Sequence, residues 1–458
     1  MSSPIKTLLW RTAIVAALII LIAGGFYAEE NARGLNAWKK VQHDLAARGE
    51  SLNWNDFIPP PVPDSQNFYK APMMTEWFIK ATNGGSAYNL NKLMANPDTT
   101  ASAIDEISAS NYLAWCMAFE PEFNQIRDAL KRPLARLDGN YSTPWLEPIP
   151  NFVNYRAINL VLAHRAKCHL LLGESSKALD DLTLLDGLNM TLASDGKPTT
   201  LVASMIHTAI AAVYCDAIAY GLDAHLWRTP ELSILQKQLG EIHLLPAVAN
   251  SLRSDRAGSC HALDSTSVDE FIRVMGAPKS MSDLGWLLMP RGWIYQNEAV
   301  IASVEDGTIA CINLTNQTIS PFKAKAANQY VERALNHVTP WNFIAAISVP
   351  SFTKAEQTMA RNQTWVDHAQ IVCALERFHL ASGKYPASLG ELVPQYLEKI
   401  PHDIITGKPM PYQSKDGQNF TLYSIGWNEI DDGGITVRNS SGNEDRESGD
   451  WVWHYPTQ

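Results

Sequence analysis

The sequence predicts an α+β protein with three parts: an N-terminal transmembrane helix, a large mainly α-helical domain of helical hairpins, and a small C-terminal domain that combines a helix with an antiparallel sheet. Residues 8–27 are almost wholly apolar, residues 73–336 have mainly helical periodicity, and Asp416-Gly417 is a hairpin signal between two short strand patterns. Because 46% of the residues are hydrophobic and only 18% are charged, the 458-residue chain is predicted to be folded.

The expected organisation divides the chain into four parts. Residues 1–30 are a cytoplasmic tail and transmembrane anchor, and residues 31–72 are a juxtamembrane helix with a proline-rich linker. Residues 73–362 form the mainly helical domain, and residues 363–458 form the C-terminal α+β domain. A chain of this length has room for two or three domains.

The apolar run near the N-terminus is about as long as a helix that crosses a bilayer. Lys6 and Arg11 lie at its start, and Glu29 and Glu30 follow it. The positive-inside rule then places the N-terminus in the cytoplasm. We therefore expect a single-pass signal-anchor protein of the bacterial inner membrane whose bulk is periplasmic. A cleaved signal peptide with a weak site at Ala23-Gly24-Gly25 is the alternative, and it also leaves the bulk outside the cytoplasm.

The juxtamembrane region combines a helix with a helix-breaking segment. Leu35, Trp38, Val41 and Leu45 recur at helical spacing, which predicts an amphipathic helix over residues 36–48. The run PPPVP at 59–63 cannot be helical and predicts an extended linker. The pattern LAARGE…FIPPPVPDSQNF resembles the juxtamembrane segment of membrane-anchored bacterial proteins of a type common in Verrucomicrobia and Planctomycetes, a resemblance that implies no activity.

The helical domain contains two informative segments. Residues 165–182 resemble one tetratricopeptide-type helical repeat, with Gly173 in the turn and the small Ala178 where the helices cross. A plain bundle hairpin explains this pattern equally well, because such solenoids need about three repeats. Residues 201–226 are apolar enough to mimic a second membrane span, but His207 and Asp216 predict a buried helix of a soluble bundle.

The C-terminal region has the clearest order of elements. A helix is predicted over residues 363–380 and ends at Ser382-Gly383. A short helix follows Tyr385-Pro386, and two antiparallel strands are predicted at 410–414 and 419–424. The segments LYSIGWNEIDDGG and GDWVW close the region.

This order resembles the C-terminal half of the major pseudopilin of type II secretion systems over about residues 366–453. In that family the acidic loop after the last long strand binds calcium, so the resemblance implies a calcium loop here. The matching positions are Asn428, where the family usually has aspartate, and Asp431, Asp432 and Asp450. Residues 435–448 depart from the family in length and composition, and an acidic turn held by Asx hydrogen bonds is the alternative. The long chain before the module favours a borrowed domain over a pilus subunit.

Standard catalytic motifs are absent from the sequence. It contains no HExxH, G-x-S-x-G, P-loop or Rossmann glycine motif. Its six cysteines form no CxxC pair; Cys168, Cys215 and Cys373 lie in apolar helical patterns that predict buried thiols, and a disulfide such as Cys260–Cys311 stays open. The net charge of −10 argues against nucleic acid as a main partner.

These observations predict a non-enzymatic, membrane-anchored interaction or scaffold protein of the cell envelope, related to secretion through its C-terminal module. Its expected partners are the membrane and another envelope protein, and its only expected cofactor is calcium. The alternative is a hydrolase-like envelope enzyme with an active site in the helical domain. That alternative requires His164, His207 and His261 to converge in one pocket.

Overall fold

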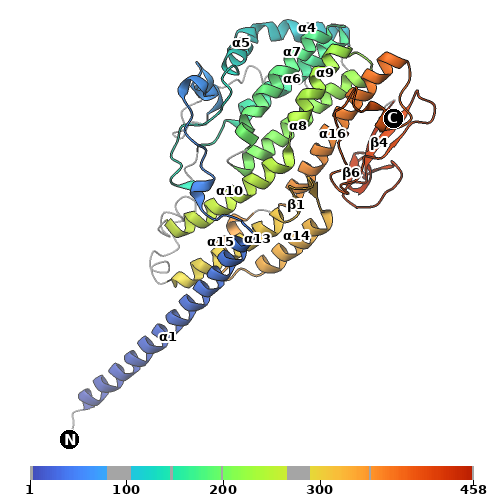
Figure 1. Cartoon of the computed structure of the whole chain (residues 1–458). Coiled ribbons are helices and arrows are strands. Elements are labelled where there is room, and N and C mark those ends of the chain that lie inside the picture. The colour runs from blue at the N-terminus through green and yellow to red at the C-terminus, as the bar shows by residue number, and fades with distance from the viewer. Residues whose placement is uncertain are drawn as a thin grey trace.

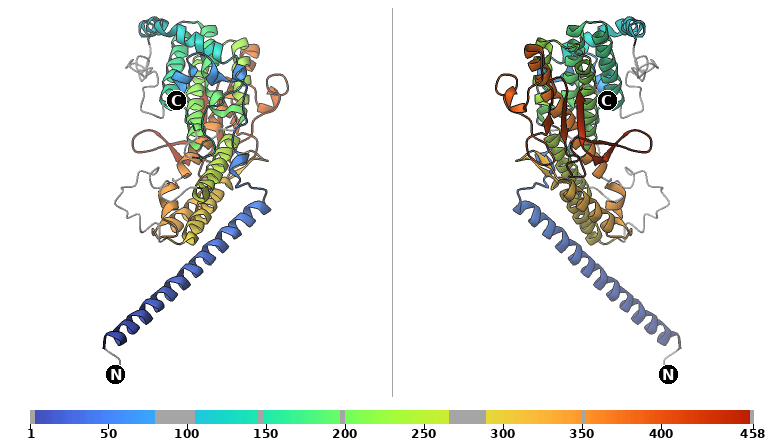
Figure 2. Two further views of the ribbon diagram at one scale, coloured as in Figure 1. Left: turned by 90° about the vertical axis from the view of Figure 1, so that its left-hand side faces the viewer. Right: turned by 90° about the vertical axis from the view of Figure 1, so that its right-hand side faces the viewer.

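The computed structural model describes residues 4–79, 105–144, 148–196, 200–265, 289–349 and 352–455. The predicted α+β class is confirmed: a helical body carries small antiparallel sheets and an apolar N-terminal helix. In Figure 1 the N-terminal helix projects from one end of the body, while the C-terminal strands lie on the flank of α16. The two turned views in Figure 2 show the same projection of the helix away from the body.

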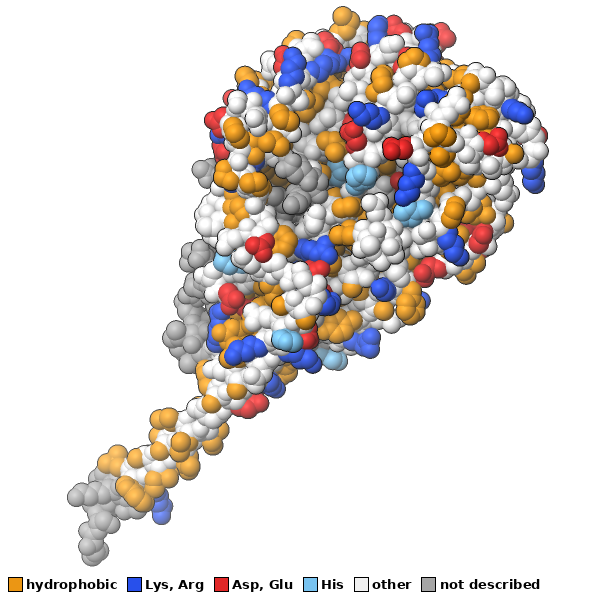
Figure 3. All heavy atoms as spheres, viewed as in Figure 1, with side chains coloured by type: hydrophobic (Ala, Val, Ile, Leu, Met, Phe, Trp, Pro, Cys, Tyr) orange, Lys and Arg blue, Asp and Glu red, His pale blue; other side chains and the backbone are white. Residues whose placement is uncertain are grey.

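The N-terminal helix α1 (Pro4–Ala47) merges the apolar run and the predicted juxtamembrane helix into one element. The boundary expected at residue 30 does not interrupt it, because the residues around that point are mostly good helix formers. The first half exposes its apolar side chains, which Figure 3 shows covering the projecting part, and its most apolar window is 0% buried. This helix is long and apolar enough to cross a membrane.

The second half of α1 buries one stripe along the helical body. Gly34, Trp38 and Leu45 are buried and follow one another at about helical spacing. Trp38 and Leu45 form a small core with Cys260, Ala299 and Ala302. The same helix therefore continues without interruption from an exposed apolar segment into a segment that packs on the helical body.

The helical body is built from consecutive helices that surround one large core. In chain order its α-helices within the described residues are α2 (Met74–Phe78), α4 (Glu106–Cys116), α5 (Glu120–Ala129), α6 (Phe152–Leu171), α7 (Ser175–Met190), α8 (Leu201–Asp223), α9 (Thr229–Glu241), α10 (Leu244–Ser265), α13 (Arg291–Ile309), α14 (Pro321–Leu335), α15 (Phe343–Ser348) and α16 (Thr353–Ser382). Between α13 and α14 lies a two-stranded hairpin, β1 (Ile312–Asn313) with β2 (Thr318–Ile319).

Helix α8 is at the centre of this body. It packs against α6, α7, α10 and α16. By length and composition α8 could also cross a membrane, but 56% of its most apolar window is buried in the body. The buried bundle helix predicted at residues 201–226 is therefore what the structure contains, and its apolar composition reflects the core.

The predicted hairpin at 165–182 is formed by α6 and α7. Gly173 makes the turn with a positive φ of 76°, a conformation that glycine adopts without steric cost. Ala178 is fully buried at the contact between the helices. All six cysteines are buried free thiols, so the alternative disulfide between Cys260 and Cys311 does not form.

Helix α16 connects the helical body to the C-terminal strands. It begins at Thr353, so the domain boundary expected at residue 363 falls inside it. It packs against α8, α9 and α10 on the body side, and also contacts β4 and β7. Gly383 ends it in the left-handed conformation (φ 74°), as the sequence predicts.

The C-terminal module, residues 383–455, contains two small antiparallel sheets. One sheet has the order β3 (Tyr412–Gln413), β4 (Phe420–Ser424) and β7 (Trp451–Tyr455), and the other pairs β5 (Thr436–Arg438) with β6 (Glu444–Gly449). The turn at Asp416-Gly417 joins β3 to β4 as predicted: Asp416 accepts hydrogen bonds from the amides of Gln418 and Asn419. The stacked rings of Trp365 and Trp453, 4.6 Å apart, join the module to α16.

Helix α1 crosses α13 at a contact between two glycines. A Cβ atom added to Gly34 would lie 2.0 Å from the carbonyl oxygen of Gly292, and one added to Gly292 would lie 2.0 Å from that of Glu30. Only glycine allows backbones to approach this closely. Hydrogen bonds reinforce the crossing: Asn31 Oδ1 accepts from the Gly292 amide at 2.8 Å, and Glu30 accepts from Trp293 Nε1 at 2.8 Å.

A network of ion pairs secures the end of α1. Glu50 accepts hydrogen bonds from Arg253 at 2.8 Å and from Arg256 at 2.6 Å, and Arg256 also donates to Asp306 at 3.3 Å. The Arg256 side chain is 0% exposed. Burial alone would raise the pKa of Glu50, but the hydrogen bonds from the two arginines outweigh burial and lower it. The charges therefore hold α1 against α10 and α13.

Candidate functional site

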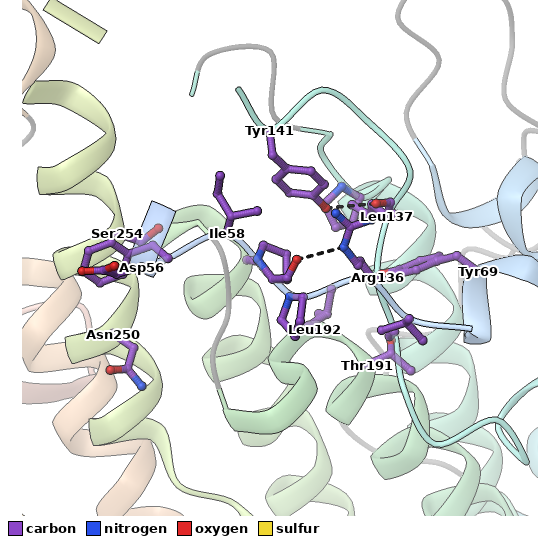
Figure 4. A pocket seen from close by; sticks show the side chains of 17 residues that line it. Asp56, Ile58, Tyr69, Arg136, Leu137, Tyr141, Thr191, Leu192, Asn250 and Ser254 are labelled. Carbon is purple, nitrogen blue, oxygen red and sulfur yellow. Dashed lines mark hydrogen bonds between the residues drawn. The ribbon is translucent and has the colours of Figure 1, made fainter. Parts of the chain in front are cut away.

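A cavity of about 310 Å³ lies where the proline-rich segment crosses the helical body (Figure 4). Its walls come from residues 56–62, from residues 135–141, and from side chains of α8 and α10. Arg136 Nε donates to the carbonyl oxygen of Pro59 at 3.0 Å. The segment predicted as a linker is therefore extended, but it packs on the body and forms a wall of the cavity.

Two groups of polar side chains face this cavity. Tyr69 and Thr191 line the cavity, and the hydroxyl of Tyr155, which is not a lining residue, connects their hydroxyls through hydrogen bonds of 2.9 and 2.7 Å. Burial raises the pKa of Tyr69 to about 12, so its phenol remains a neutral hydroxyl. On the other side the guanidinium of Arg136 lies over the ring of Tyr141, 4.7 Å from its centroid.

The lining of the cavity is suited to binding and lacks the parts of a nucleophilic site. Ser254 presents a buried hydroxyl that has no hydrogen-bond partner within the described residues. A catalytic serine needs an adjacent base, and no histidine is among the described residues that line the cavity. The carboxylate of Asp56 already accepts hydrogen bonds from Ser51 and Asn53. The cavity therefore fits an apolar group with one or two polar atoms.

The structure brings the four predicted calcium residues together beside the β4–β7 pair. Asn428 Nδ2 donates to Asp432 Oδ2 at 3.0 Å. Asp450 is 1% exposed and accepts from the amides of Gly434 at 2.6 Å and Asp432 at 3.2 Å. Asp431 Oδ1 accepts from the hydroxyl of Tyr423 at 3.2 Å. Hydrogen bonds thus link the 428–434 loop to Asp450, but among the described residues the carboxylates of Asp431, Asp432 and Asp450 do not form a group whose ligand oxygens all lie within 4.8 Å of one another.

The donor set of this loop fits calcium, which prefers several oxygen ligands. Burial raises the pKa of Asp450, and the charges of Asp432 and Asp431 add to the rise, so a cation would relieve their repulsion. The same amide hydrogen bonds are also those of the alternative, an acidic turn held by Asx contacts. Calcium binding by Asn428, Asp431, Asp432 and Asp450 therefore stays a prediction.

We expect saturating calcium to raise the melting temperature of the C-terminal module, because an ion that binds only the native state stabilises it. At a concentration 100-fold above its dissociation constant, the gain is about 2.7 kcal/mol. Scanning calorimetry of the full chain in detergent, with calcium or with chelator, measures the shift. Asp431→Asn keeps an acceptor oxygen for Tyr423 but removes one charged ligand, so it should reduce the calcium shift. Equal melting curves with and without calcium would favour the Asx turn.

A second polar group, which we call the seam cluster, lies where α16 meets the end of α8 and the last strand. It consists of His225, Glu376, His379, Tyr385 and Tyr455. Glu376 is 2% exposed, and one of its oxygens lies 2.6 Å from Nδ1 of His225. The hydroxyl of Tyr385 donates to the other oxygen at 3.1 Å, and Nδ1 of His379 lies 4.0 Å from it. The hydroxyl of Tyr455 contacts Nε2 of His225.

The sequence contains only part of the signal for the seam cluster. Glu376 and His379 are three residues apart in a predicted helix, and this spacing places their side chains on the same face. His225 is 151 residues away from Glu376, and no local pattern links the two. Its positive φ of 51° is also invisible in the sequence, although such non-glycine outliers concentrate at functional sites.

The three histidines on which the enzyme alternative depends lie on three helices. His164 is on α6, with its ring 4.3 Å from that of Tyr112. His207 is on α8 and contacts the backbone oxygen of Asn189, and burial lowers its pKa to about 4. His261 is on α10. None of the three lines the 310 Å³ cavity or belongs to the seam cluster.

Comparison of the chain with protein-family models, with curated proteins and with solved structures finds no match. Function is therefore inferred from the residues and their geometry.

Proposed function

We propose that this chain is a membrane-anchored interaction or scaffold protein of the bacterial cell envelope. In this proposal α1 spans the inner membrane, the body lies on the periplasmic side, and the C-terminal module is a pseudopilin-like domain related to secretion. The observation that carries the proposal is the junction between α1 and the body. A helix apolar enough to cross a membrane continues directly into a segment that is fixed to the helical body by the Gly34–Gly292 contact and the Glu50–Arg256 pair.

Aromatic side chains around this junction support a position close to the bilayer surface. The rings of Phe26 and Trp293 meet edge to face at 6.3 Å, and the guanidinium of Arg33 lies 5.4 Å from the ring of Trp341. Tryptophan and arginine are typical of the membrane–water interface. In the proposed arrangement these residues face the lipid headgroups.

The opposite end of the body offers a surface for a protein partner. Ile107 and Met117 are 74% and 75% exposed at the two ends of α4. A cavity of about 680 Å³ beside them is lined by Leu113, Arg127 and Arg165, among others. Exposed apolar surface rimmed by polar side chains is common at interaction sites. The body thus combines a membrane end and an apolar distal end.

The alternative function, a hydrolase-like envelope enzyme, has weaker support. Its expected histidines lie apart, and the cavity with Ser254 has no histidine among its described lining residues. Hydrolysis without a metal needs a nucleophile and an adjacent base. The arrangement described above offers binding surfaces and no such pair at that cavity.

A photoreactive amino acid at position 117, in the full chain expressed in its own cells, is expected to give one discrete cross-linked product with a second protein. The exposed apolar position would lie in the proposed interface, where the probe reaches only direct neighbours. Lys131, at the same end of the body, has a 77% exposed polar side chain and serves as the control position. Gel mobility and mass spectrometry identify the product. If neither position 107 nor position 117 gives a product above the control, the interaction function is wrong.

A further inference from the structure

We propose that the seam cluster is a zinc site, in which His225, Glu376 and His379 ligate one ion between the helical body and the C-terminal module. One imidazole comes from the residues after α8, and the other two ligands come from α16. Among the described residues, one ligand atom from each of the three lies within 4.8 Å of the others. This site is separate from the acidic loop and from the interaction function proposed above.

The distances suit a small ion after modest movement. Zinc–nitrogen bonds of about 2.0–2.1 Å in a tetrahedral site place ligand atoms about 3.3 Å apart. Here the His225–Glu376 pair is closer, at 2.6 Å, and the His379–Glu376 pair is farther, at 4.0 Å. The two imidazole rings are stacked at an interplanar angle of 22°, so one must rotate to direct its nitrogen at the ion. His225 can do so, because its side chain is 35% exposed.

The identity of the donors selects the class of metal. Two imidazole nitrogens and one carboxylate are a typical zinc set, whereas calcium and magnesium prefer oxygen ligands. Three protein ligands also leave a fourth position, on the exposed side of His225, for water or another ligand. The seam cluster therefore differs in chemistry from the acidic loop of Asp431 and Asp450.

The cluster also contains groups that an ion would satisfy. Nδ1 of His379 is buried and has no hydrogen-bond partner within the described part of the chain. Glu376 is 2% exposed and already has hydrogen-bond partners in His225 and Tyr385, so an ion would take the place of its contact with His225. Tyr385 donates to Glu376 Oε2, as outer-shell partners of metal ligands commonly do. The tyrosine would orient the carboxylate towards the ion.

The full chain, untagged, in detergent and stripped with chelator, tests this site by cobalt titration. We expect one equivalent of Co²⁺ to give a saturable visible absorption band that zinc then abolishes. His379→Ala should weaken binding by more than about 100-fold, since loss of a ligand exceeds the 10–100-fold typical of outer-shell changes. Tyr385→Phe should weaken it by about 10-fold. His337→Ala, at an exposed position outside the cluster, should bind as the unchanged chain does.

Two results would overturn the zinc site. One is the absence of a saturable cobalt band in the unchanged chain. The other is equal metal affinity in the unchanged chain and in His379→Ala. If circular dichroism shows that His379→Ala does not fold, the cobalt titration is made with His225→Gln instead. The side chain of His225 is partly exposed, so its replacement is tolerated more easily. Unchanged cobalt affinity in His225→Gln contradicts the proposal in the same way.

Discussion

Gly34→Val is expected to release the second half of α1, which packs on α13, from the helical body. The new side chain would begin with a Cβ atom 2.0 Å from the carbonyl oxygen of Gly292, and backbone atoms cannot move aside as a flexible side chain can. Overpacking typically costs about 1–3 kcal/mol and occasionally more, and a clash with fixed backbone atoms belongs at the upper end, about 3 kcal/mol. Hydrogen exchange of the α1 amides between residues 35 and 47 should therefore accelerate by at least about 100-fold, since each 1.4 kcal/mol corresponds to a factor of ten.

Gly25→Val is the matched control for this experiment. It makes the same substitution in the same helix, so the change in helix propensity is the same, but no other atom lies within 4 Å of its added Cβ. We expect its exchange between residues 35 and 47 to equal that of the unchanged chain. Equal exchange in Gly34→Val as well would mean that the anchor helix does not cross α13 at this glycine.

Arg256→Met is expected to destabilise the body by about 3 kcal/mol, the lower end of the roughly 3–5 kcal/mol that loss of one member of a buried ion pair costs. The substitution keeps much of the side-chain volume and removes the buried cation, but Glu50 keeps its pair with Arg253 and Asp306 its pair with Arg48. Thermal or urea unfolding of the full chain in detergent measures the loss. Adding Glu50→Gln to Arg256→Met should cost less than the two separate losses combined, because the two residues share one network.

Arg48→Met provides the contrast at the same junction. Arg48 pairs with Asp306 at 2.8 Å, but its side chain is 50% exposed, and exposed pairs contribute about 0–1 kcal/mol. A loss as large as that of Arg256→Met would show that burial does not distinguish the two arginines.

The network also predicts a pH dependence of the stability of the folded chain. Because the pKa of Glu50 is lowered in the folded chain, its stabilisation is complete above the ordinary value of 4.5 and disappears as the pH falls through the lowered one.

The elements governed by local patterns could be predicted from the sequence. The turn at Asp416-Gly417, the end of α16 at Gly383 and the hairpin around Gly173 each depend on residues within a few positions of one another. Glycine and Asx chemistry fixes such turns without reference to the rest of the fold. The α+β class followed, because these signals separate a helical region from a strand region.

Features that depend on distant residues could not be predicted. Nothing near Gly34 indicates that Gly292 will contact it, and the PPPVP run excludes a helix without indicating that Arg136 will bind its backbone. The two halves of α1 were predicted as separate elements because their side-chain patterns differ. The backbone nevertheless continues, since no residue between them terminates a helix. The seam cluster depends in the same way on how α8 and α16 cross.

In the proposed membrane-spanning arrangement, the continuity of α1 sets the height of the body above the bilayer. A helix of 44 residues is about 66 Å long, of which about 30 Å would lie in the hydrocarbon core. A flexible tether would let the body search a hemisphere around its anchor. A continuous helix joined to the body through Gly34 and Arg256 removes that freedom. In the proposed arrangement, the surface around Ile107 and Met117 would then lie at a fixed distance from the bilayer, and a tilt of α1 would change that distance.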